Sequence, residues 1–215
     1  FNKHYFFLIV TFPLKHYTFQ QVDQKYYSWQ SIRYFDGKLE NQTINEQRTE
    51  RVFAFELYHQ YRKQMEFNSL DFSDLLFNAE VSKSYIHETL SSNDYCLIDI
   101  NISSRLIIPD LVLHKGQIYA DSNGQKLIIE IKSTINPEVK KDLHKILLMI
   151  DKFNFEYGVF ITINSELETV IKKIRNSFKK DITKYEELFK KLIILNRKSA
   201  FKEIYKENLL NILKQ

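Results

Sequence analysis

Hydrophobic residues recur along this chain with two different spacings, and each spacing predicts a different kind of element. In residues 45–65 the apolar positions return at steps of three and four, which is the pattern of one buried stripe along a helix. Short runs rich in β-branched residues follow and predict strands. The stripe consists of Phe53, Ala54, Leu57, Tyr58, Tyr61 and Met65, and the three runs are residues 95–102, 105–114 and 126–133.

A second helix and a fourth strand complete the predicted body of the protein. Residues 136–153 read as a helix with Asn136 as its N-cap and Pro137 at its first position. Residues 157–164 (YGVFITIN) read as a strand, a short helix is expected near residues 79–90, and two or three amphipathic helices are expected beyond Glu166. The predicted fold class is α/β, in the order helix, three strands, helix, strand, helices.

Composition narrows the class of protein. A chain of 215 residues with 44% hydrophobic residues can bury one core, and its single cysteine, Cys96, excludes a disulfide framework and a multi-cysteine zinc site. The N-terminal run YFFLIVTF is too short to span a bilayer and lacks a small-residue cleavage site. We therefore expect a cytoplasmic protein that is not bound to a membrane.

Charge is distributed unevenly along the chain. From Ile171 onward there are 13 Lys and Arg against 5 Asp and Glu, so this segment carries +8 and the first 170 residues carry −4. A basic segment beside an acidic body suits a protein that binds a polyanion at one place and cations at another. Solvated faces of Lys-rich helices are the simpler interpretation.

Three charged residues stand at unusual places in the predicted strands. Asp110 follows Pro109 within the second strand, although proline is tolerated only at edges and bulges. Glu130 and Lys132 share one face of the third strand, because residues two apart point the same way. A hairpin would bring Asp110 close to Glu130, and two ionised carboxylates repel unless a cation lies between them. The alternative is a half-buried strand with its charged face in water.

The three side chains together suit hydrolysis of a phosphodiester. Two carboxylates and a backbone carbonyl, that of Ile131, are the hard oxygen ligands that Mg²⁺ prefers, and Mn²⁺ is expected to substitute. Such an ion lowers the pKa of water and neutralises charge on a phosphoryl oxygen. A lysine beside it can position the attacking water.

The segments Pro109-Asp110 and Glu130-Ile131-Lys132 resemble the motif of the PD-(D/E)XK nuclease superfamily, which has the restriction-endonuclease-like fold. The resemblance implies a core of a helix, three antiparallel strands, a helix and a fourth strand. It predicts a nuclease core at residues 45–165, preceded by an extension (1–44) and followed by a Lys-rich helical extension (166–215). It also implies an Mg²⁺-dependent endonuclease with Asp110 and Glu130 as metal ligands.

Members of this superfamily often add a glutamate from the first helix, and this chain offers Glu50 and Glu56. At 100° per residue Glu50 lies at the centre of the apolar stripe, whereas Glu56 lies to one side. A glutamate on a buried stripe must be paired or bind metal, so Glu50 is the predicted site residue. A favourable charge in the exposed first turn of the helix is the alternative role.

The predicted substrate is DNA, cleaved in a prokaryotic restriction, phage-defence, repair or mobile-element setting. Lysines are the candidates for phosphate contacts, with solvated helix surface as the alternative; they are Lys145, Lys172, Lys173, Lys179 and Lys180. No recognition module is visible, so sequence specificity would come from a homodimer or a partner protein. An RNA-cleaving nuclease, or a nucleic-acid-binding module that retains the fold without cleavage, are the rival functions.

Overall fold

In the computed structural model of the chain, the residues whose structure is described are 50, 53–55, 57–59, 61–62, 75–79, 96–97, 100–101, 109–115, 124–133, 139–178, 182, 185–198 and 203–215. The strands are β1 (Leu75–Ala79), β2 (Cys96–Leu97), β3 (Ile100–Asn101), β4 (Leu111–Lys115), β5 (Gln125–Lys132), β6 (Tyr157–Ile163), β7 (Leu192–Arg197) and β8 (Tyr205–Asn208). The helices with defined bounds are α4 (Val139–Lys152), α5 (Leu167–Ser177), α6 (Glu186–Lys190) and α7 (Leu209–Lys214).

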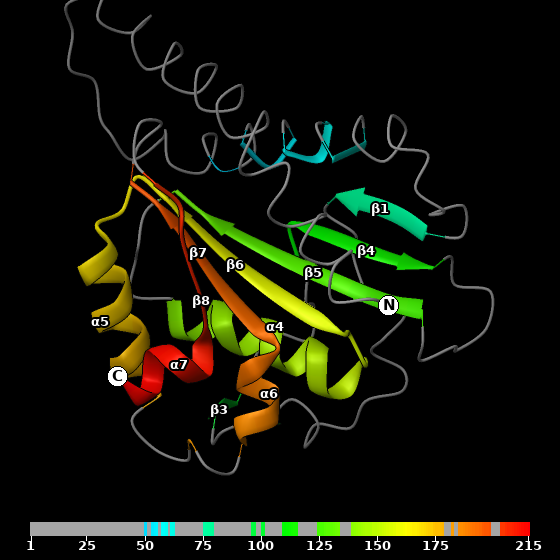
Figure 1. Ribbon diagram of the computed structural model, residues 1–215. Coiled ribbons are helices and arrows are strands. Elements are labelled where there is room, and N and C mark those ends of the chain that lie inside the picture. The colour runs from blue at the N-terminus through cyan, green and yellow to red at the C-terminus, as the bar shows by residue number, and fades with distance from the viewer. Residues whose placement is uncertain are drawn as a thin grey trace, which may run out of the picture.

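The described residues between 50 and 62 are also helical, and we call them the 50–62 helical segment. They are drawn in cyan in Figure 1. The longest helix with defined bounds, α4, has 14 residues. None of the helices in the described part of the chain is both long and apolar enough to cross a membrane.

Six strands form one mixed, open sheet in the order β1-β4-β5-β6-β7-β8 (Figure 1). Strand β4 is antiparallel to both β1 and β5, β6 and β7 continue parallel to β5, and β8 is antiparallel to β7. Parallel neighbours need a crossover connection, and α4 supplies it between β5 and β6. The protein is therefore an α/β protein with a six-stranded mixed sheet.

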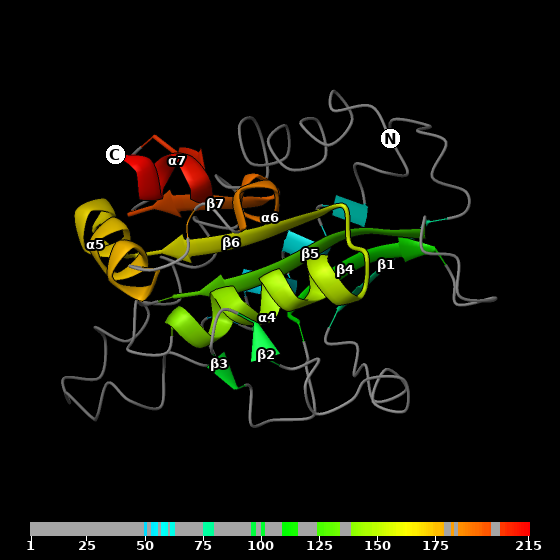
Figure 2. The same ribbon diagram turned by 90° about the horizontal axis from the view of Figure 1, so that it is seen from below.

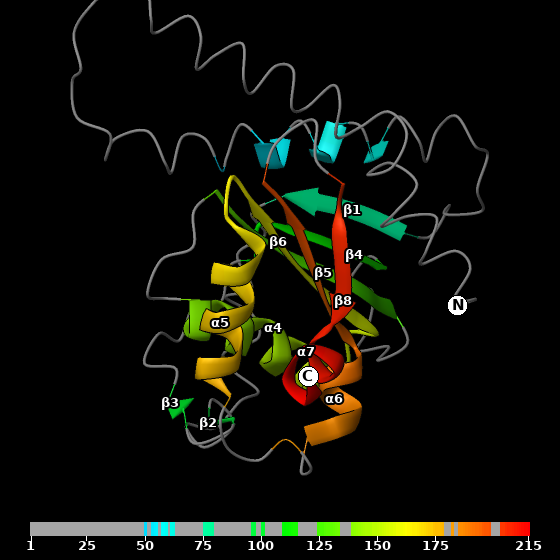
Figure 3. The same cartoon turned by 60° about the vertical axis from the view of Figure 1, so that its left-hand side comes forward.

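Helices cover both faces of this sheet (Figures 1 and 2). Helices α4 to α7 pack on one face, and the 50–62 helical segment packs on the other. Figure 3 shows the same three layers from another side. Side chains alternate along β5, so Ile128 joins the core under α4 while Ile129 joins the opposite core. Burial of both faces explains why the central strands read as nearly continuous apolar runs.

Helix α4 lies very close to β6 because Gly158 has no side chain. A Cβ built at Gly158 would stand 2.1 Å from Cγ2 of Ile146 and 3.0 Å from Cδ1 of Ile150. Both isoleucines are buried on α4, and Ile146 is fully buried. The glycine thus sets the distance between α4 and the sheet, and this distance matters because α4 carries residues of the site described below.

Several predicted elements are confirmed. Strands β5 and β6 coincide with the predicted runs 126–133 and 157–164, and α4 lies within the predicted helix 136–153. The described residues of the predicted helix 45–65 are helical, and its apolar positions at 53, 54, 57 and 61 are buried. Asn136 and Pro137 lie outside the described residues.

The strand predicted at residues 95–102 is wrong as a member of the sheet. Its described residues form β2 and β3, which pair only with each other as a two-stranded sheet. The neighbour of β4 is instead β1, which the sequence did not predict. The short helix expected near residues 79–90 lies outside the described residues except for Ala79, which ends β1. An edge strand that buries one residue, Phe77, shows little periodicity.

The expectation that the chain is helical throughout beyond Glu166 is also wrong. Helices α5, α6 and α7 are present, but β7 and β8 lie between them and extend the main sheet. The conformation of a short apolar run such as LIILNR cannot be assigned from its sequence. Its residues are buried on both faces of the strand, so they lack the alternation that separates a strand from a buried helix turn. Only the pairing of β7 with β6 decides its conformation.

Candidate functional site

Glu130 and Lys132 of β5 face α4, and Glu130 is buried whereas Lys132 is half-buried. Glu130 and Lys132 point to the same side of the strand as Ile128, whereas Ile129 and Ile131 point to the 50–62 helical segment. The predicted alternation is therefore confirmed. The alternative of a charged face in water is wrong for Glu130, of which 3% is exposed.

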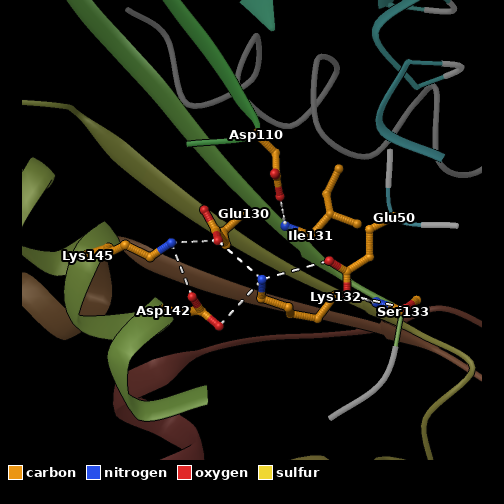
Figure 4. Close-up of polar contacts among 8 residues, drawn as sticks. All are labelled: Glu50, Asp110, Glu130, Ile131, Lys132, Ser133, Asp142 and Lys145. Atoms are coloured by element: carbon orange, nitrogen blue, oxygen red, sulfur yellow. Dashed lines mark hydrogen bonds and ion pairs between the residues drawn. The ribbon is translucent and has the colours of Figure 1, made fainter. Parts of the chain in front are cut away.

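Asp110 occupies the place where the β4 backbone stops pairing with β5. Leu111, the first residue of β4, pairs with Ile129, so β4 offers no backbone partner to Ile131. The Asp110 carboxylate takes that role, and its Oδ2 accepts a hydrogen bond of 2.6 Å from the Ile131 N–H (Figure 4). Pro109 and Asp110 lie just before β4 and not within it as predicted. Pro109 has no N–H to donate, but at this position it interrupts no backbone hydrogen bond between the strands.

Glu50 reaches the same end of β5 from the opposite face of the sheet. Its Oε1 accepts hydrogen bonds from the backbone N–H of Ser133 at 2.9 Å and from the Ser133 hydroxyl at 3.2 Å. Its Oε2 lies 3.9 Å from the Lys132 Nζ. The structure thus brings Glu50 to the residues of β5, as the helical geometry predicted, and Glu56 lies outside the described residues.

Two lysines and two carboxylates form a closed ring of ion pairs (Figure 4). The Lys145 Nζ lies 2.8 Å from Oε1 of Glu130 and 3.1 Å from Oδ1 of Asp142. The Lys132 Nζ lies 3.5 Å from the same Glu130 oxygen and 3.6 Å from Oδ2 of Asp142. Each carboxylate therefore contacts both ammonium groups, and Asp142 uses a separate oxygen for each.

Burial shifts the protonation equilibria of the acids at this site. Burial raises the pKa of Glu130 to about 7, the nearby charge of Asp110 adds to the increase, and Lys145 and Lys132 oppose it. Burial likewise raises the pKa of Asp110, against the hydrogen bond from Ile131. Ionisation of Glu130 is thus disfavoured below about pH 7 unless further positive charge arrives.

Burial acts on the pKa values of the two lysines in the opposite direction. Burial alone would lower the pKa of both, because it penalises the charged amine. The carboxylates around Lys132 and Lys145 outweigh burial and raise the pKa of each. Both side chains are therefore ammonium ions, and Lys132 is not a base in this arrangement.

The donor atoms at the end of β5 suit a hard divalent cation. In a strand the N–H and C=O of one residue point to the same side, so the Ile131 carbonyl faces the Asp110 edge that its N–H faces. With the carboxylates of Asp110 and Glu130 this gives the oxygen ligands that Mg²⁺ prefers. The described residues contain no ready group of three or more His, Cys, Asp or Glu ligands. A cation would therefore compete with the ammonium groups for Glu130.

Of the other predicted lysines, the two that the structure describes are not members of this ring. Lys172 and Lys173 are on α5, the first exposed and the second half-buried, and Lys179 and Lys180 lie outside the described residues. Lys145, predicted to contact phosphate or solvent, instead contacts two buried carboxylates. Its ability to contact a phosphate stays a prediction.

Asp142 is the residue that the sequence interpretation missed. It lies on the buried side of α4 with Val139, Leu143 and Ile146, and 4% of it is exposed. The signal was present, because a carboxylate on an apolar helix stripe must be paired, which is the argument that selected Glu50. The spacing of three between Asp142 and Lys145 was the second sign.

Comparison of the chain with protein-family models, with curated proteins and with solved structures found no match to any of them.

Proposed function

We propose that this protein is a metal-dependent endonuclease that hydrolyses phosphodiester bonds in DNA. The observation that carries the proposal is the meeting of Asp110, Glu130 and Lys132 at one end of β5, where burial and mutual repulsion leave the two acids in need of a cation. The same three residues carry the resemblance to the PD-(D/E)XK superfamily. Residues that converge from separate strands are stronger support than a short motif alone.

The order of elements also supports this family. The resemblance implies a helix, three antiparallel strands, a helix and a fourth strand. The chain has the 50–62 helical segment, the antiparallel strands β1, β4 and β5, then α4 and the parallel strand β6. We therefore propose that the sheet and its helices are a restriction-endonuclease-like core, extended by β7 and β8.

In this proposal Asp110, Glu130 and the Ile131 carbonyl hold Mg²⁺ or Mn²⁺, with Glu50 completing or buffering the site. A bound ion supplies positive charge to the reacting phosphate and lowers the pKa of the attacking water. Lys132, kept protonated by the surrounding carboxylates, donates a hydrogen bond that orients this water. The hydrogen bond from Ile131 fixes the orientation of the Asp110 carboxylate, so this ligand is preorganised.

The acidic residues Asp110 and Glu130 and the lysine Lys132 of the family motif are all present. Their presence favours an enzyme over a module that only binds nucleic acid. DNA is the proposed substrate, with RNA as the alternative that the catalytic groups serve equally well. A homodimer or a partner protein is the proposed source of specificity.

Incubation of the purified protein with supercoiled plasmid, linear duplex, single strand and RNA tests the proposal, with Mg²⁺, Mn²⁺ or EDTA in parallel. Asp110→Asn and Glu130→Gln are the matched controls, because each amide oxygen still accepts the hydrogen bond that the carboxylate accepted. We expect metal-dependent cleavage of DNA that both variants lose. Absence of cleavage with every substrate, or equal cleavage by the variants, would refute the proposal.

A further inference from the structure

We propose that Asp142 is a positioning residue that takes over Lys145 when a divalent cation binds Glu130. Lys145 is then the resident counter-ion of the metal-free site, and Asp142 is its receiver. This inference rests on the proposed metal site and deepens it, since it says how the site changes between its two charge states.

Lys145 is already shared between the two carboxylates. Its Nζ is 2.8 Å from the Glu130 carboxylate and 3.1 Å from that of Asp142 (Figure 4). A change of partner therefore requires no rearrangement of the chain. The ammonium group only has to shorten one contact that exists and lengthen the other.

Asp142 has spare capacity to accept hydrogen bonds. Its Oδ2 is buried and accepts none within the described part of the chain, although the Lys132 Nζ lies 3.6 Å away. A buried carboxylate oxygen without a hydrogen bond is unfavourable, so a donor that approaches it is stabilised. Asp142 can thus accept one lysine at each oxygen when Glu130 is engaged elsewhere.

Glu130, in contrast, cannot serve two lysines and a metal ion together. Both of its ion pairs with lysine use Oε1. A divalent cation on this carboxylate repels the ammonium groups that share it, and the repulsion is strong because the side chain is 4% exposed. The nearest anion left for Lys145 is Asp142.

Asp142, which is proposed to accept Lys145, is held in place by a different element from the one that carries the metal ligand Glu130. Asp142 and Lys145 stand three residues apart on α4, whereas Glu130 is on β5. Helix α4 is held against the sheet by a fully buried apolar stripe that includes Leu143, Ile146 and Leu147. Lys145 can therefore move between carboxylates on two rigid elements.

The test measures binding of Mn²⁺ alone, without DNA, by calorimetric titration of the full chain and of variants. Lys145→Gln removes the competing cation and keeps a donor, so Mn²⁺ should bind about tenfold more tightly. Asp142→Asn leaves Lys145 with Glu130 as its anionic partner, so Mn²⁺ should bind about tenfold more weakly. Lys140→Gln, an exposed site on the same helix with the same charge change, is the control and should change affinity less than about twofold.

The double variant Asp142→Asn/Lys145→Gln decides between this inference and a simple charge effect. If Asp142 acts through Lys145, the double variant should bind Mn²⁺ within about threefold of Lys145→Gln alone, because no ammonium remains to be received. If the two charges act independently on the metal, the effects add and the double variant returns to the affinity of the unaltered protein. That result would overturn the inference.

Two further outcomes keep the inference separate from the proposed function. Lys145→Gln is informative even where Asp142→Asn does not fold, and unchanged or weaker Mn²⁺ binding by it overturns the inference while the nuclease proposal stands. Absence of saturable Mn²⁺ binding by the unaltered protein, or binding that Glu130→Gln leaves intact, overturns both.

Discussion

A carboxyl group that loses nearly all of its water needs compensating positive charge, and Glu130 obtains it from two lysines. The compensation is incomplete, because Asp110 adds negative charge at the same strand end and the pKa of Glu130 rises to about 7. Glu50 and Asp142 approach one of these lysines, Lys132, from the two faces of the sheet. At the scale of single residues, the ionised carboxylates of the site are therefore incompletely neutralised, and a bound cation would stabilise them.

Replacement of Lys132 by methionine should separate metal binding from catalysis. Methionine keeps the apolar stem and removes the charge, so turnover should fall by at least about a hundredfold. Binding of Mn²⁺ should be retained or become tighter, because one ammonium group that repels the ion is removed. Plasmid cleavage rates and calorimetric titration measure the two quantities. Lys140→Met, on the exposed side of α4, is the control and should cleave normally. Cleavage that survives in Lys132→Met would remove this lysine from the mechanism.

The raised pKa of Glu130 predicts how stability changes with pH in the absence of metal. The folded protein holds this proton more tightly than the unfolded chain, so the contribution of Glu130 is complete below about pH 4.5 and is lost as pH rises through about 7. Glu130→Gln cannot ionise. Its stability relative to the unaltered protein should therefore increase between pH 4.5 and 7.5, by on the order of 3 kcal/mol.

Urea denaturation in EDTA at a series of pH values measures this difference. The comparison with Glu130→Gln is necessary because His144 contributes the opposite slope. Burial lowers the pKa of His144 to about 4, so its contribution is present above pH 6.5 and is lost as pH falls. A stability difference that stays constant across the range would contradict the assignment of the raised pKa to Glu130.

At the scale of elements, the site depends on how closely α4 approaches the sheet. The helix supplies Asp142 and Lys145, and the strand β5 supplies Glu130 and Lys132. Two ion pairs connect the two elements, Lys145–Glu130 at 2.8 Å and Lys132–Asp142 at 3.6 Å. An outward shift of the helix by one ångström would lengthen both of these ion pairs. Gly158 on β6 permits the present spacing.

Gly158→Ala should therefore destabilise the protein by about 1–3 kcal/mol, because the new methyl group overlaps Ile146 and displaces α4. Chemical denaturation measures the loss. The double variant Gly158→Ala/Ile146→Ala should cost less than the sum of the two single changes, since the shorter side chain makes room. Additive losses would show that the glycine does not act through contact with α4.

At the scale of the whole molecule, charge divides the chain into an acidic part and a basic part. The basic part includes α5, which begins where β6 ends, next to the end of β5 that carries the site (Figures 1 and 3). A DNA duplex that reaches the site would pass a surface where positive charge is favourable. The candidates for this contact are the four predicted lysines of the basic part, of which Lys172 and Lys173 lie on α5.

Charge reversal at Lys172, Lys173, Lys179 and Lys180 should weaken DNA binding for every sequence and flatten its salt dependence. Each lost phosphate contact should reduce the slope of log affinity against log salt by about 0.9. Fluorescence anisotropy at several salt concentrations measures this slope. Metal affinity should change little, because exposed charges beyond about 10 Å are screened at ordinary salt.

A single reversal at Lys152 is the matched control for a single reversal at Lys172. Lys152 is exposed on the last turn of α4, whereas Asp142 of the site lies on its first turn, and reversal there should leave the slope unchanged. An unchanged slope in the fourfold variant would assign the basic segment to solvated helix surface and leave the proposed active site untouched.

The sequence by itself determined those elements whose residues repeat with a clear period or carry strong local signals. The stripe of the first helix, the runs of β5 and β6 and the helix α4 follow from periodicity and burial, which act over a few neighbouring residues. The position of Asp110 beside the end of β5 that carries Glu130 followed from hairpin geometry, and Glu50 was selected by its position on a buried stripe.

The tertiary structure alone decided what depends on partners far apart in the chain. β1 and β7 are strands because they pair with β4 and β6, and their own short sequences do not distinguish a strand from other conformations. Asp142 joins the site because α4 packs on β5 at a distance that no local pattern encodes. Pairing and packing energies arise only when distant segments meet, which is why these features appear in the folded chain and not in its pattern of residues.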